Sequence, residues 1–267
     1  MIYESWTISK DWLAQRGIIF WLIVVVIIAI LIGILIYLYY NPHYGLYPYN
    51  YFIDKCVDSQ TLYKGDELKE IFPASTEFEN NWQDIRKEAS QVLDLENFNV
   101  WQEFISADDD FWKGWNVFTL RLYGVDIENN MKRCPRLARL LRQHTDIHTA
   151  VFSILEPGKV IPPHYGPNKG ILRYHLGLII PEGDCHLKVD EDVYYWQEGE
   201  GIIFDETYLH SAHNNTDRLR VVLYMDIPRP MPYKLLENLN GWVLWAIENS
   251  SHNKSAINKV KKSYNVI

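Results

Sequence analysis

The sequence is poor in cysteine and has no concentrated positive charge, and each shortage excludes a class of protein. Its three cysteines, Cys56, Cys134 and Cys185, are odd in number and lack the spacing of a zinc knuckle or a CxxC motif. Neither a disulfide scaffold nor a thiolate metal site is therefore indicated. The formal net charge is -8 and no basic block occurs, so nothing in the composition points to nucleic acid as a partner. Internal repeats and low-complexity tracts are also absent.

Charge is missing altogether from residues 18–38, which read IIFWLIVVVIIAILIGILIYL. At about 1.5 Å per residue in a helix, this run is about 30 Å long, which is the thickness of the hydrocarbon core of a bilayer. Trp21 near its start and the tyrosines at its end resemble the aromatic belts of membrane proteins. The sequence therefore predicts an N-terminal tail at 1–16 and a single transmembrane helix at 17–40.

The segment that follows, residues 41–75, is rich in tyrosine, proline and asparagine. Because proline and turn-forming residues interrupt a helix, we expect a juxtamembrane connector here rather than a continuation of the membrane helix. Helical spacing of apolar residues begins after residue 80, and residues 134–141 indicate a second helix with Pro135 in its first turn. Both helices are expected to pack on a sheet.

From residue 149 onward the pattern changes to short apolar runs separated by Gly, Pro, Asn and Asp. These runs are 150–155, 172–180, 186–189, 193–196, 201–204 and 219–227. Strands at this spacing are typical of antiparallel sandwiches and barrels. The predicted fold class is mainly β: a double-stranded β-helix (jelly-roll or cupin-like) barrel of about eight strands, with flanking helices.

The last part of the chain, residues 233–267, is predicted to be an amphipathic helix and a tail. It is too short and too polar to cross a bilayer. Trp242 and Trp245 leave two interpretations open. The helix either caps the barrel or lies on the membrane surface.

The most informative residues are two histidines, His164 and His210, which lie 46 residues apart. Neutral imidazole binds iron, zinc, copper and nickel, and two such ligands with open positions beside them make a reactive metal site. A single histidine is more often an ordinary surface residue. The arginines that accompany the pair, Arg173 and Arg220, strengthen the metal interpretation because they could hold an anion beside the metal.

Arg173 and His175 alternate with apolar residues, so in a strand they share one face and point into the barrel together. A buried arginine is costly without a partner, so either protein carboxylates or an anionic ligand must meet Arg173. Within the run 219–225, Arg220 has no acidic neighbour on its own face of the strand. It either faces into the barrel for the same purpose or lies outward on a solvated face of the sheet.

Several motifs occur together in a characteristic order. They are FSILEPG at 152–158, HYGP at 164–167, LRYHLGLIIP at 172–181, FDETYLH at 204–210, and the later Arg220. In order and spacing they resemble the aspartyl/asparaginyl β-hydroxylase domain, a family of iron(II)- and 2-oxoglutarate-dependent dioxygenases. The resemblance covers residues 76–232, which we expect to form the dioxygenase domain.

The resemblance implies that His164 and His210 bind iron(II). Gly166 stands where the carboxylate of the usual two-histidine-one-carboxylate triad is expected, and this absence is itself typical of the family. Asp205 and His213 could orient a ligand, or they could be ordinary loop residues.

The resemblance also implies a site for 2-oxoglutarate. Ser153 and Arg220 would hold its distal carboxylate, and Arg173 with His175 would contact the carboxylate beside the keto group. With O2, such an enzyme converts 2-oxoglutarate to succinate and carbon dioxide and hydroxylates an unactivated C–H bond. The planar guanidinium fork suits bidentate binding of a carboxylate.

The sequence leaves the substrate open between two branches of the family. The short connector and the tryptophan-rich C-terminal helix favour the membrane-anchored lipid A hydroxylases, which act on an acyl chain. Lys10 and Arg16 precede the membrane helix, and this bias places the catalytic domain on the non-cytoplasmic face, which favours hydroxylation of Asp or Asn side chains in proteins. The alternative of another class is a catalytically silent barrel that binds a carboxylate or tethers a partner at the membrane. A lipid or protein substrate and the bilayer itself are thus the expected partners, and the membrane face stays open.

Overall fold

The computed structural model describes residue 25 and residues 42–93, 99–100 and 113–264. Two compact units are distinguished, Met1–Gly45 and Leu46–Ile267. Apart from Val25, the predicted transmembrane helix at 17–40 lies outside the described residues. Among the residues that are described, no helix has both the length and the apolar character needed to cross a membrane.

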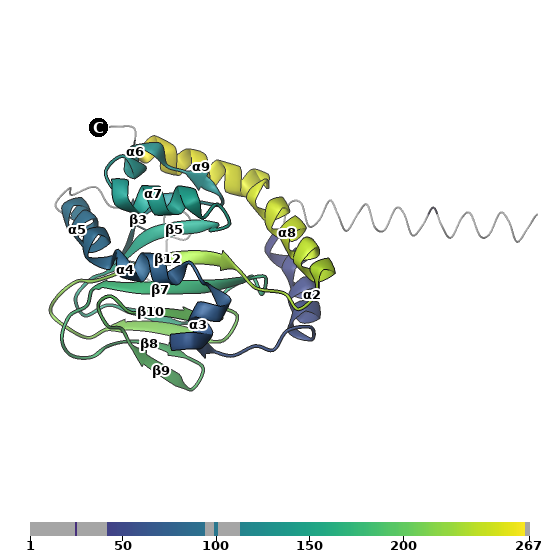
Figure 1. Ribbon diagram of the computed structural model, residues 1–267, viewed down its shortest axis with the longest axis horizontal. Helices are drawn as coiled ribbons and strands as arrows, with labels where there is room; N and C mark the ends of the chain where they lie inside the picture. The colour runs from purple at the N-terminus through teal and green to yellow at the C-terminus, as the bar shows by residue number, and fades with distance from the viewer. Residues whose placement is uncertain (1–24, 26–41, 94–98, 101–112, 265–267) are drawn as a thin grey trace, which may run out of the picture. The chain divides into compact units, whose positions relative to one another are not determined.

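The core of the second unit consists of two antiparallel sheets (Figure 1). The larger has the order β1-β10-β7-β12-β5-β3-β2 with β4 beside β3, and the smaller has the order β6-β11-β8-β9. The barrel strands are β5(Thr149–Leu155), β6(Val160–His164), β7(Ile171–Ile179), β8(Cys185–Val189), β9(Asp192–Tyr195), β10(Gly201–Phe204), β11(His210–Asn214) and β12(Arg220–Pro228). The chain crosses between the sheets at nearly every step, which is the jelly-roll arrangement that the sequence predicts. The short β1(Leu62–Tyr63), β2(Asn99–Val100) and β4(Val125–Asp126) and the longer β3(Trp115–Leu122) extend the larger sheet.

The larger sheet separates two different environments because successive side chains of a strand point to opposite faces. On one face, Leu172, Tyr174 and Leu176 of β7 join an apolar core with the helices. On the other face, Arg173 contacts Tyr224 and His175 contacts Phe204, which in turn contacts His210 of the smaller sheet, so Arg173 and His175 share a face as predicted. The polar residues of interest therefore lie between the two sheets.

The helices that cover the outer face include the two that the sequence predicts. They are α5(Trp82–Leu93) and α7(Pro135–Gln143), with Pro135 at the start of α7. The shorter α3(Gly65–Ile71), α4(Ser75–Asn80) and α6(Glu128–Met131) complete this layer. Helix α5 buries Ile85, Ala89 and Val92, the residues whose spacing indicated the helix.

The segment 41–75, predicted as a connector, contains a helix of 13 residues that its prolines did not indicate, α2(Pro42–Asp54). Pro48 lies inside this helix. A proline removes one backbone hydrogen bond and normally breaks a helix. Tertiary contacts outweigh that cost here: Ile53 is fully buried, and Tyr49 donates a hydrogen bond to Asn240 at 2.6 Å.

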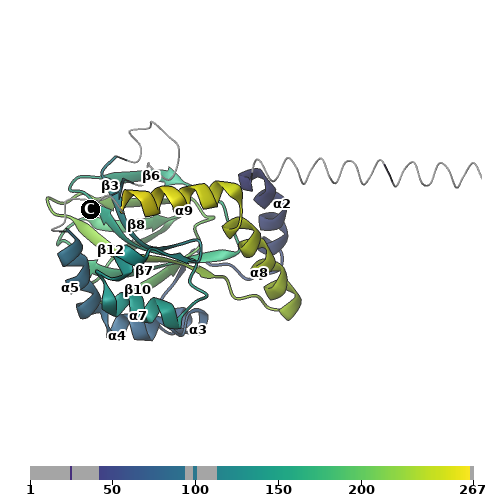
Figure 2. The same cartoon turned by 90° about the horizontal axis from the view of Figure 1, so that it is seen from above.

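The C-terminal region forms two helices rather than one, α8(Lys234–Glu248) and α9(Ser251–Ser263) (Figure 2). Ser250 separates them and caps α9 by accepting a hydrogen bond from the Asn253 backbone N–H at 3.2 Å. Helix α9 packs into the outer core through Ile257, Val260 and the adjacent Tyr264. The C-terminal region is thus part of the same compact unit as the barrel.

Candidate active site

His164 and His210 lie side by side on two paired strands of the smaller sheet. His164 is the last residue of β6 and His210 is the first residue of β11, and the strand register pairs them directly. Their ring centroids are 4.2 Å apart. Pro162 and Pro163 are tolerated in β6 because it is an edge strand. The backbone of two hydrogen-bonded strands therefore fixes the separation of the two imidazoles.

Both imidazoles are oriented by backbone carbonyls. Nδ1 of His164 lies 2.9 Å from the Pro162 carbonyl oxygen, and Nδ1 of His210 lies 3.0 Å from that of Tyr208. Each Nδ1–H donates to its carbonyl, which leaves the lone pair on Nε2, as in metal-binding histidines. Burial lowers the pKa of His164, and burial together with the His164 ring lowers the pKa of His210 to about 3. Two neutral imidazoles suit a divalent metal ion.

The space beside Gly166 is filled by the side chain of Glu206. A Cβ atom at position 166 would collide with Cγ and Cδ of Glu206, and the Gly166 backbone N–H donates to the Glu206 carbonyl oxygen at 2.7 Å. Only glycine allows this approach. A buried carboxylate thus lies against the position where the common triad carries its own carboxylate. No group of three or more His, Cys, Asp or Glu side chains suited to a metal occurs within the described part of the chain.

Arg173 is neutralised by protein carboxylates. Its guanidinium forms ion pairs with Glu206 and with Asp226, whose Oδ1 accepts from Nε at 3.1 Å and from Nη2 at 3.0 Å. The guanidinium also lies 4.4 Å from the centroid of the Tyr224 ring. Burial raises the pKa of Glu206 to about 7, against the lowering effect of Arg173. The charge of Arg173 therefore has partners without any ligand.

Arg220 has no such compensation. It is 1% exposed, and no carboxylate of the described residues lies within ion-pair distance. Its Nη1 donates to the carbonyl and hydroxyl oxygens of Ser153, both at 3.3 Å, and its Nε has no hydrogen-bond partner among the described residues. The ring of Trp196 lies 4.7 Å from the guanidinium. Burial lowers the pKa of Arg220 to about 10, which measures how poorly the surroundings stabilise the cation.

His175 lies between the arginine and the histidine pair. Its ring contacts Phe204 and Trp196, at centroid distances of 5.1 and 6.0 Å, and Phe204 in turn contacts His210 at 5.4 Å. Neither ring nitrogen of His175 has a hydrogen-bond partner among the described residues, and the same is true of Trp196 Nε1. Burial, and then the charge of Arg220, lowers the pKa of His175 well below its ordinary value, so it is neutral.

These orphaned groups fit an anionic ligand with several oxygen atoms. Buried polar atoms are nearly always hydrogen-bonded, so a group of orphaned polar atoms around one buried cation is suited to binding an anion. Ser153 belongs to the same group, because its hydroxyl accepts from Arg220 Nη1 at 3.3 Å as well as from Trp115 Nε1 at 2.9 Å. The structure thus gathers Ser153, His175 and Arg220 on one side of the metal-ligand candidates, and pairs Arg173 with carboxylates instead.

Asp205 supports the segment that carries His210. Its carboxylate accepts from the Thr207 backbone N–H at 3.0 Å, lies 2.8 Å from Lys169 Nζ and forms an ion pair with Arg229. Burial alone would raise the pKa of Asp205, but Arg229 and Lys169 outweigh it and the pKa lies below the ordinary value. Asp205 is therefore a structural anchor.

His213 lies away from the metal-ligand candidates. Its ring stacks on His186 with centroids 4.4 Å apart, and its Nε2 lies 3.0 Å from Ser211 Oγ.

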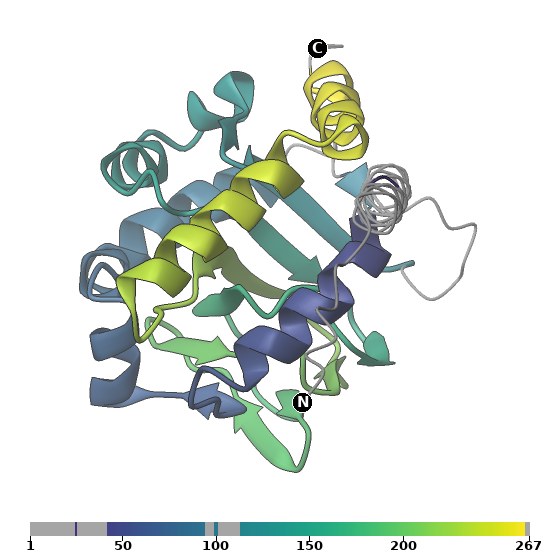
Figure 3. The same ribbon diagram turned by 90° about the vertical axis from the view of Figure 1, so that its right-hand side faces the viewer.

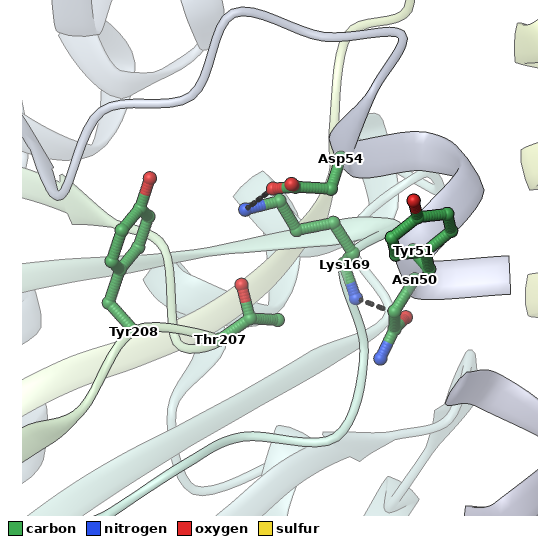
Figure 4. A pocket seen from close by; sticks show the side chains of 6 residues that line it. All are labelled: Asn50, Tyr51, Asp54, Lys169, Thr207 and Tyr208. Carbon is green, nitrogen blue, oxygen red and sulfur yellow. Dashed lines mark hydrogen bonds and ion pairs between the residues drawn. The ribbon is translucent and has the colours of Figure 1, made fainter. Parts of the chain in front are cut away.

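A cavity of about 370 Å³ lies beside the segment that joins β10 to β11 (Figure 4). Its lining residues are Asn50, Tyr51, Asp54, Lys169, Thr207 and Tyr208. Thr207 and Tyr208 come just before His210, and Lys169 comes five residues after His164. Lys169 reaches Asp54 of α2 at 3.1 Å across the cavity. The two chain segments that carry His164 and His210 therefore also contribute residues to the lining of the cavity.

Three residues of the site were missed from the sequence. Glu206 lies inside a recognised motif but had no assigned role, and Trp196 ends an expected strand. Asp226 could have been found from alternation, because it shares a strand face with Arg220 at an even spacing. Its pairing with Arg173 depends on the register between β12 and β7, which places the two residues opposite each other.

Comparison with known proteins gives relatives over most of the described barrel. The family model for aspartyl/asparaginyl beta-hydroxylase matches residues 79–230. The chain is 39% identical over 187 residues to an ornithine lipid ester-linked acyl 2-hydroxylase of Rhizobium tropici, which covers 67% of this chain and 63% of the relative. It is 31% identical over 159 residues to the aspartyl/asparaginyl beta-hydroxylase of Mus musculus, which covers 57% of this chain and 21% of the relative. The matches span less than two thirds of the length of either relative.

Among solved structures, a prolyl hydroxylase from Trichoplax adhaerens in complex with a hypoxia inducible factor oxygen degradation domain peptide fragment aligns with 62% of this chain and 94% of that chain, with a TM-score of 0.43 and 11% identity. A likeness this distant carries no conclusion about function. The family model, by contrast, matches more than half of the sequence. The chain belongs to the aspartyl/asparaginyl β-hydroxylase family.

Proposed function

We propose that this chain is an iron(II)- and 2-oxoglutarate-dependent hydroxylase. The observation that carries the proposal is Arg220, a buried guanidinium that lacks a carboxylate partner in the described structure and lies in the same interior as two neutral, backbone-oriented imidazoles. An anionic cosubstrate would supply the missing charge. When bound, iron with 2-oxoglutarate and O2 supplies the oxidising power for C–H hydroxylation.

The residues of the site would bind the metal, bind the cosubstrate and exclude water. His164 and His210 would hold iron(II) through Nε2, since their Nδ1–H groups are committed to carbonyl oxygens. Arg220 and the Ser153 hydroxyl would bind one carboxylate of 2-oxoglutarate, with His175 lining the same space. The apolar core around them would exclude water from the site.

Arg173 would act differently from Arg220. The prediction that it contacts 2-oxoglutarate remains a prediction, but its two carboxylate partners favour a positioning role. Glu206 lies against Gly166, two residues from His164, and Arg173 keeps it in place. We assign this pair to shaping the space beside the iron, next to the position that the usual triad fills with a carboxylate ligand.

Anaerobic titration with iron(II) and 2-oxoglutarate tests the cofactor assignment. We expect a visible charge-transfer absorption, and succinate formation when air is admitted. His210→Ala should abolish both, whereas His213→Ala, on the same strand but stacked on His186, should leave both intact. Loss of the signals in the His213 variant alone, or their absence from the wild-type chain, would contradict the assignment. The second result would favour a catalytically silent carboxylate-binding barrel.

For the substrate, an acyl chain of a membrane lipid has the stronger support. The relative that acts on an ornithine lipid acyl chain shares 39% identity over 187 residues, a longer match at higher identity than the mouse aspartyl/asparaginyl hydroxylase. An acyl 2-hydroxylase reacts at the carbon next to the carbonyl, so the head group must lie close to the metal. The polar cavity beside Thr207 and Tyr208 could accommodate such a group.

The alternative substrate is the side chain of Asp or Asn in a protein, which the mouse relative supports. Mass spectrometry distinguishes the lipid substrate from the protein substrate. The full chain in detergent is incubated with iron(II), 2-oxoglutarate and either a bacterial lipid extract or Asp- and Asn-containing peptides. A gain of one oxygen atom on an acyl chain supports the lipid assignment. Oxygen incorporation only into peptides would replace it with the protein substrate.

A further inference from the structure

Helix α8 has two apolar faces. Leu236, Asn240 and Leu244 are buried against the domain. The opposite face carries Leu235 and Trp242, which are 79% and 70% exposed. A helix on the surface of a water-soluble domain normally has a polar outer face, so an apolar outer face indicates a second partner.

Helix α2 has the same property and touches α8. Its Tyr51 is 70% exposed while Ile53 is fully buried. The Tyr49 hydroxyl donates to Asn240 of α8 at 2.6 Å, and both side chains crowd Gly170, where a Cβ would collide with them. Figure 3 shows the two helices side by side at the same end of the domain. Most of the large apolar side chains that are exposed in the described structure lie on or next to these two helices.

We propose that this α2–α8 face lies against the surface of a lipid bilayer. We define the face by Tyr47, Tyr51, Phe52, Leu235, Leu239, Trp242 and Trp245. Tryptophan and tyrosine, with an apolar ring and a polar tip, are the residues enriched at the membrane interface. Helix α8 has 15 residues and is about 22 Å long, too short to cross a hydrocarbon core of about 30 Å. It would therefore lie in the plane of the interface.

The predicted membrane span at 17–40 favours the bilayer, rather than a protein, as the occupant of the α2–α8 face. Helix α2 begins at Pro42, two residues after the predicted membrane span at 17–40 ends. Two residues of extended chain reach about 7 Å at most. If that span crosses a bilayer, the first turn of α2 is held close to the head groups. The exposed aromatic residues of α2 then lie where interfacial aromatic residues are found.

The α2–α8 face and the cavity near the candidate active site have a residue in common. Tyr51 belongs both to the α2–α8 face and to the lining of the 370 Å³ cavity. Thr207 and Tyr208 line the same cavity and come just before His210. A lipid could thus reach the site without leaving the bilayer surface. This access route rests on the proposed function, whereas the docking of the face on the bilayer does not.

Spin labelling of the full chain in phosphatidylcholine nanodiscs tests the docking. The partly exposed Cys56 is first replaced by serine, and the two buried cysteines stay. A nitroxide is attached to Leu235→Cys or to Trp242→Cys, and as a matched control to Tyr195→Cys, an exposed aromatic position on β9 of the smaller sheet. Collision rates with O2, which concentrates in lipid, and with a water-soluble nickel chelate are compared. We expect the O2-to-nickel ratio at 235 and 242 to exceed that at 195 severalfold.

Two results would overturn the proposal. One is equal access of the nickel chelate to positions 235, 242 and 195. The other is dipolar broadening between labels at 242 in discs that hold two copies, which would assign the face to a second copy of the chain. An independent measurement needs no cysteine: brominated phosphatidylcholine should quench the wild-type tryptophan fluorescence more than that of Trp242→Phe/Trp245→Phe. Equal quenching would count against docking, and neither measurement depends on hydroxylase activity.

Discussion

Arg220 and Arg173 provide a direct test of the site, because the same substitution should have opposite consequences at the two positions. Both arginines lie on the inner face of the larger sheet, where Arg220 is 1% exposed and the Arg173 side chain is 13% exposed. Arg173 is paired with Glu206 and Asp226, whereas Arg220 contacts Ser153 and Trp196 but no carboxylate of the described residues. Methionine fits either position because it is unbranched and adaptable.

The expected magnitudes follow from this difference in partners. Arg173→Met leaves two buried carboxylates without their cation, which should cost about 3–5 kcal/mol of unfolding free energy. For a domain of this size, that lowers the melting temperature by about 6–20 °C. Arg220→Met removes an uncompensated buried charge, so the ligand-free protein should melt at the wild-type temperature or above it. Its 2-oxoglutarate dissociation constant should rise about 30- to 5,000-fold, which corresponds to about 2–5 kcal/mol.

Two measurements on each variant test the predicted stability and the predicted affinity for 2-oxoglutarate. Thermal unfolding by circular dichroism, without metal or cosubstrate, gives the stability of the ligand-free chain. Calorimetric titration of 2-oxoglutarate in the presence of manganese(II), a redox-inert substitute for iron(II), gives the dissociation constant. Tight 2-oxoglutarate binding by Arg220→Met would refute the assignment of the anion site. A melting temperature of Arg220→Met as low as that of Arg173→Met would show that the Arg220 charge is compensated within the protein.

Three further predictions concern the rest of the site. Manganese(II) binding, measured by electron paramagnetic resonance, should be lost in His210→Ala and kept in His213→Ala. Gly166→Ala should cost about 1–3 kcal/mol of unfolding free energy in a urea titration, because the new methyl group collides with the buried Glu206 side chain. Asp205→Asn should cost about 3–5 kcal/mol at pH 7, because it leaves two cationic partners with an uncharged group. The lowered pKa of Asp205 means that this difference should persist down to about pH 4 and shrink below it, as the wild-type carboxylate becomes protonated.

Each of these has an outcome that would contradict it. Equal loss of manganese in the two histidine variants would mean that the effect is structural. An unchanged urea midpoint for Gly166→Ala would mean that Glu206 moves aside at no cost. A difference between wild type and Asp205→Asn that stays constant from pH 7 to pH 3 would mean that the carboxylate has no lowered pKa.

Six of the eight barrel strands and the two scaffold helices could be predicted because their signals are local. Alternation in 172–178 and helical spacing in α5 depend only on which residues follow one another. Strands β6 and β11 gave no such signal, because they read VIPPH and HSAHN. They are strands because each finds a partner in the smaller sheet. Helix α2 likewise depends on a contact with α8, almost two hundred residues away in sequence.

The sequence by itself identified the candidate residues of the site. His164 and His210, and the shared face of Arg173 and His175, follow from motif and from the two-residue period of a strand. Only the tertiary structure decided what each arginine does. Asp226 lies opposite Arg173 because of the register between β12 and β7, while Arg220 faces an interior with no described carboxylate. Register is set by how whole strands pair and pack, so neither arginine nor its sequence neighbours reveal which of the two has carboxylate partners.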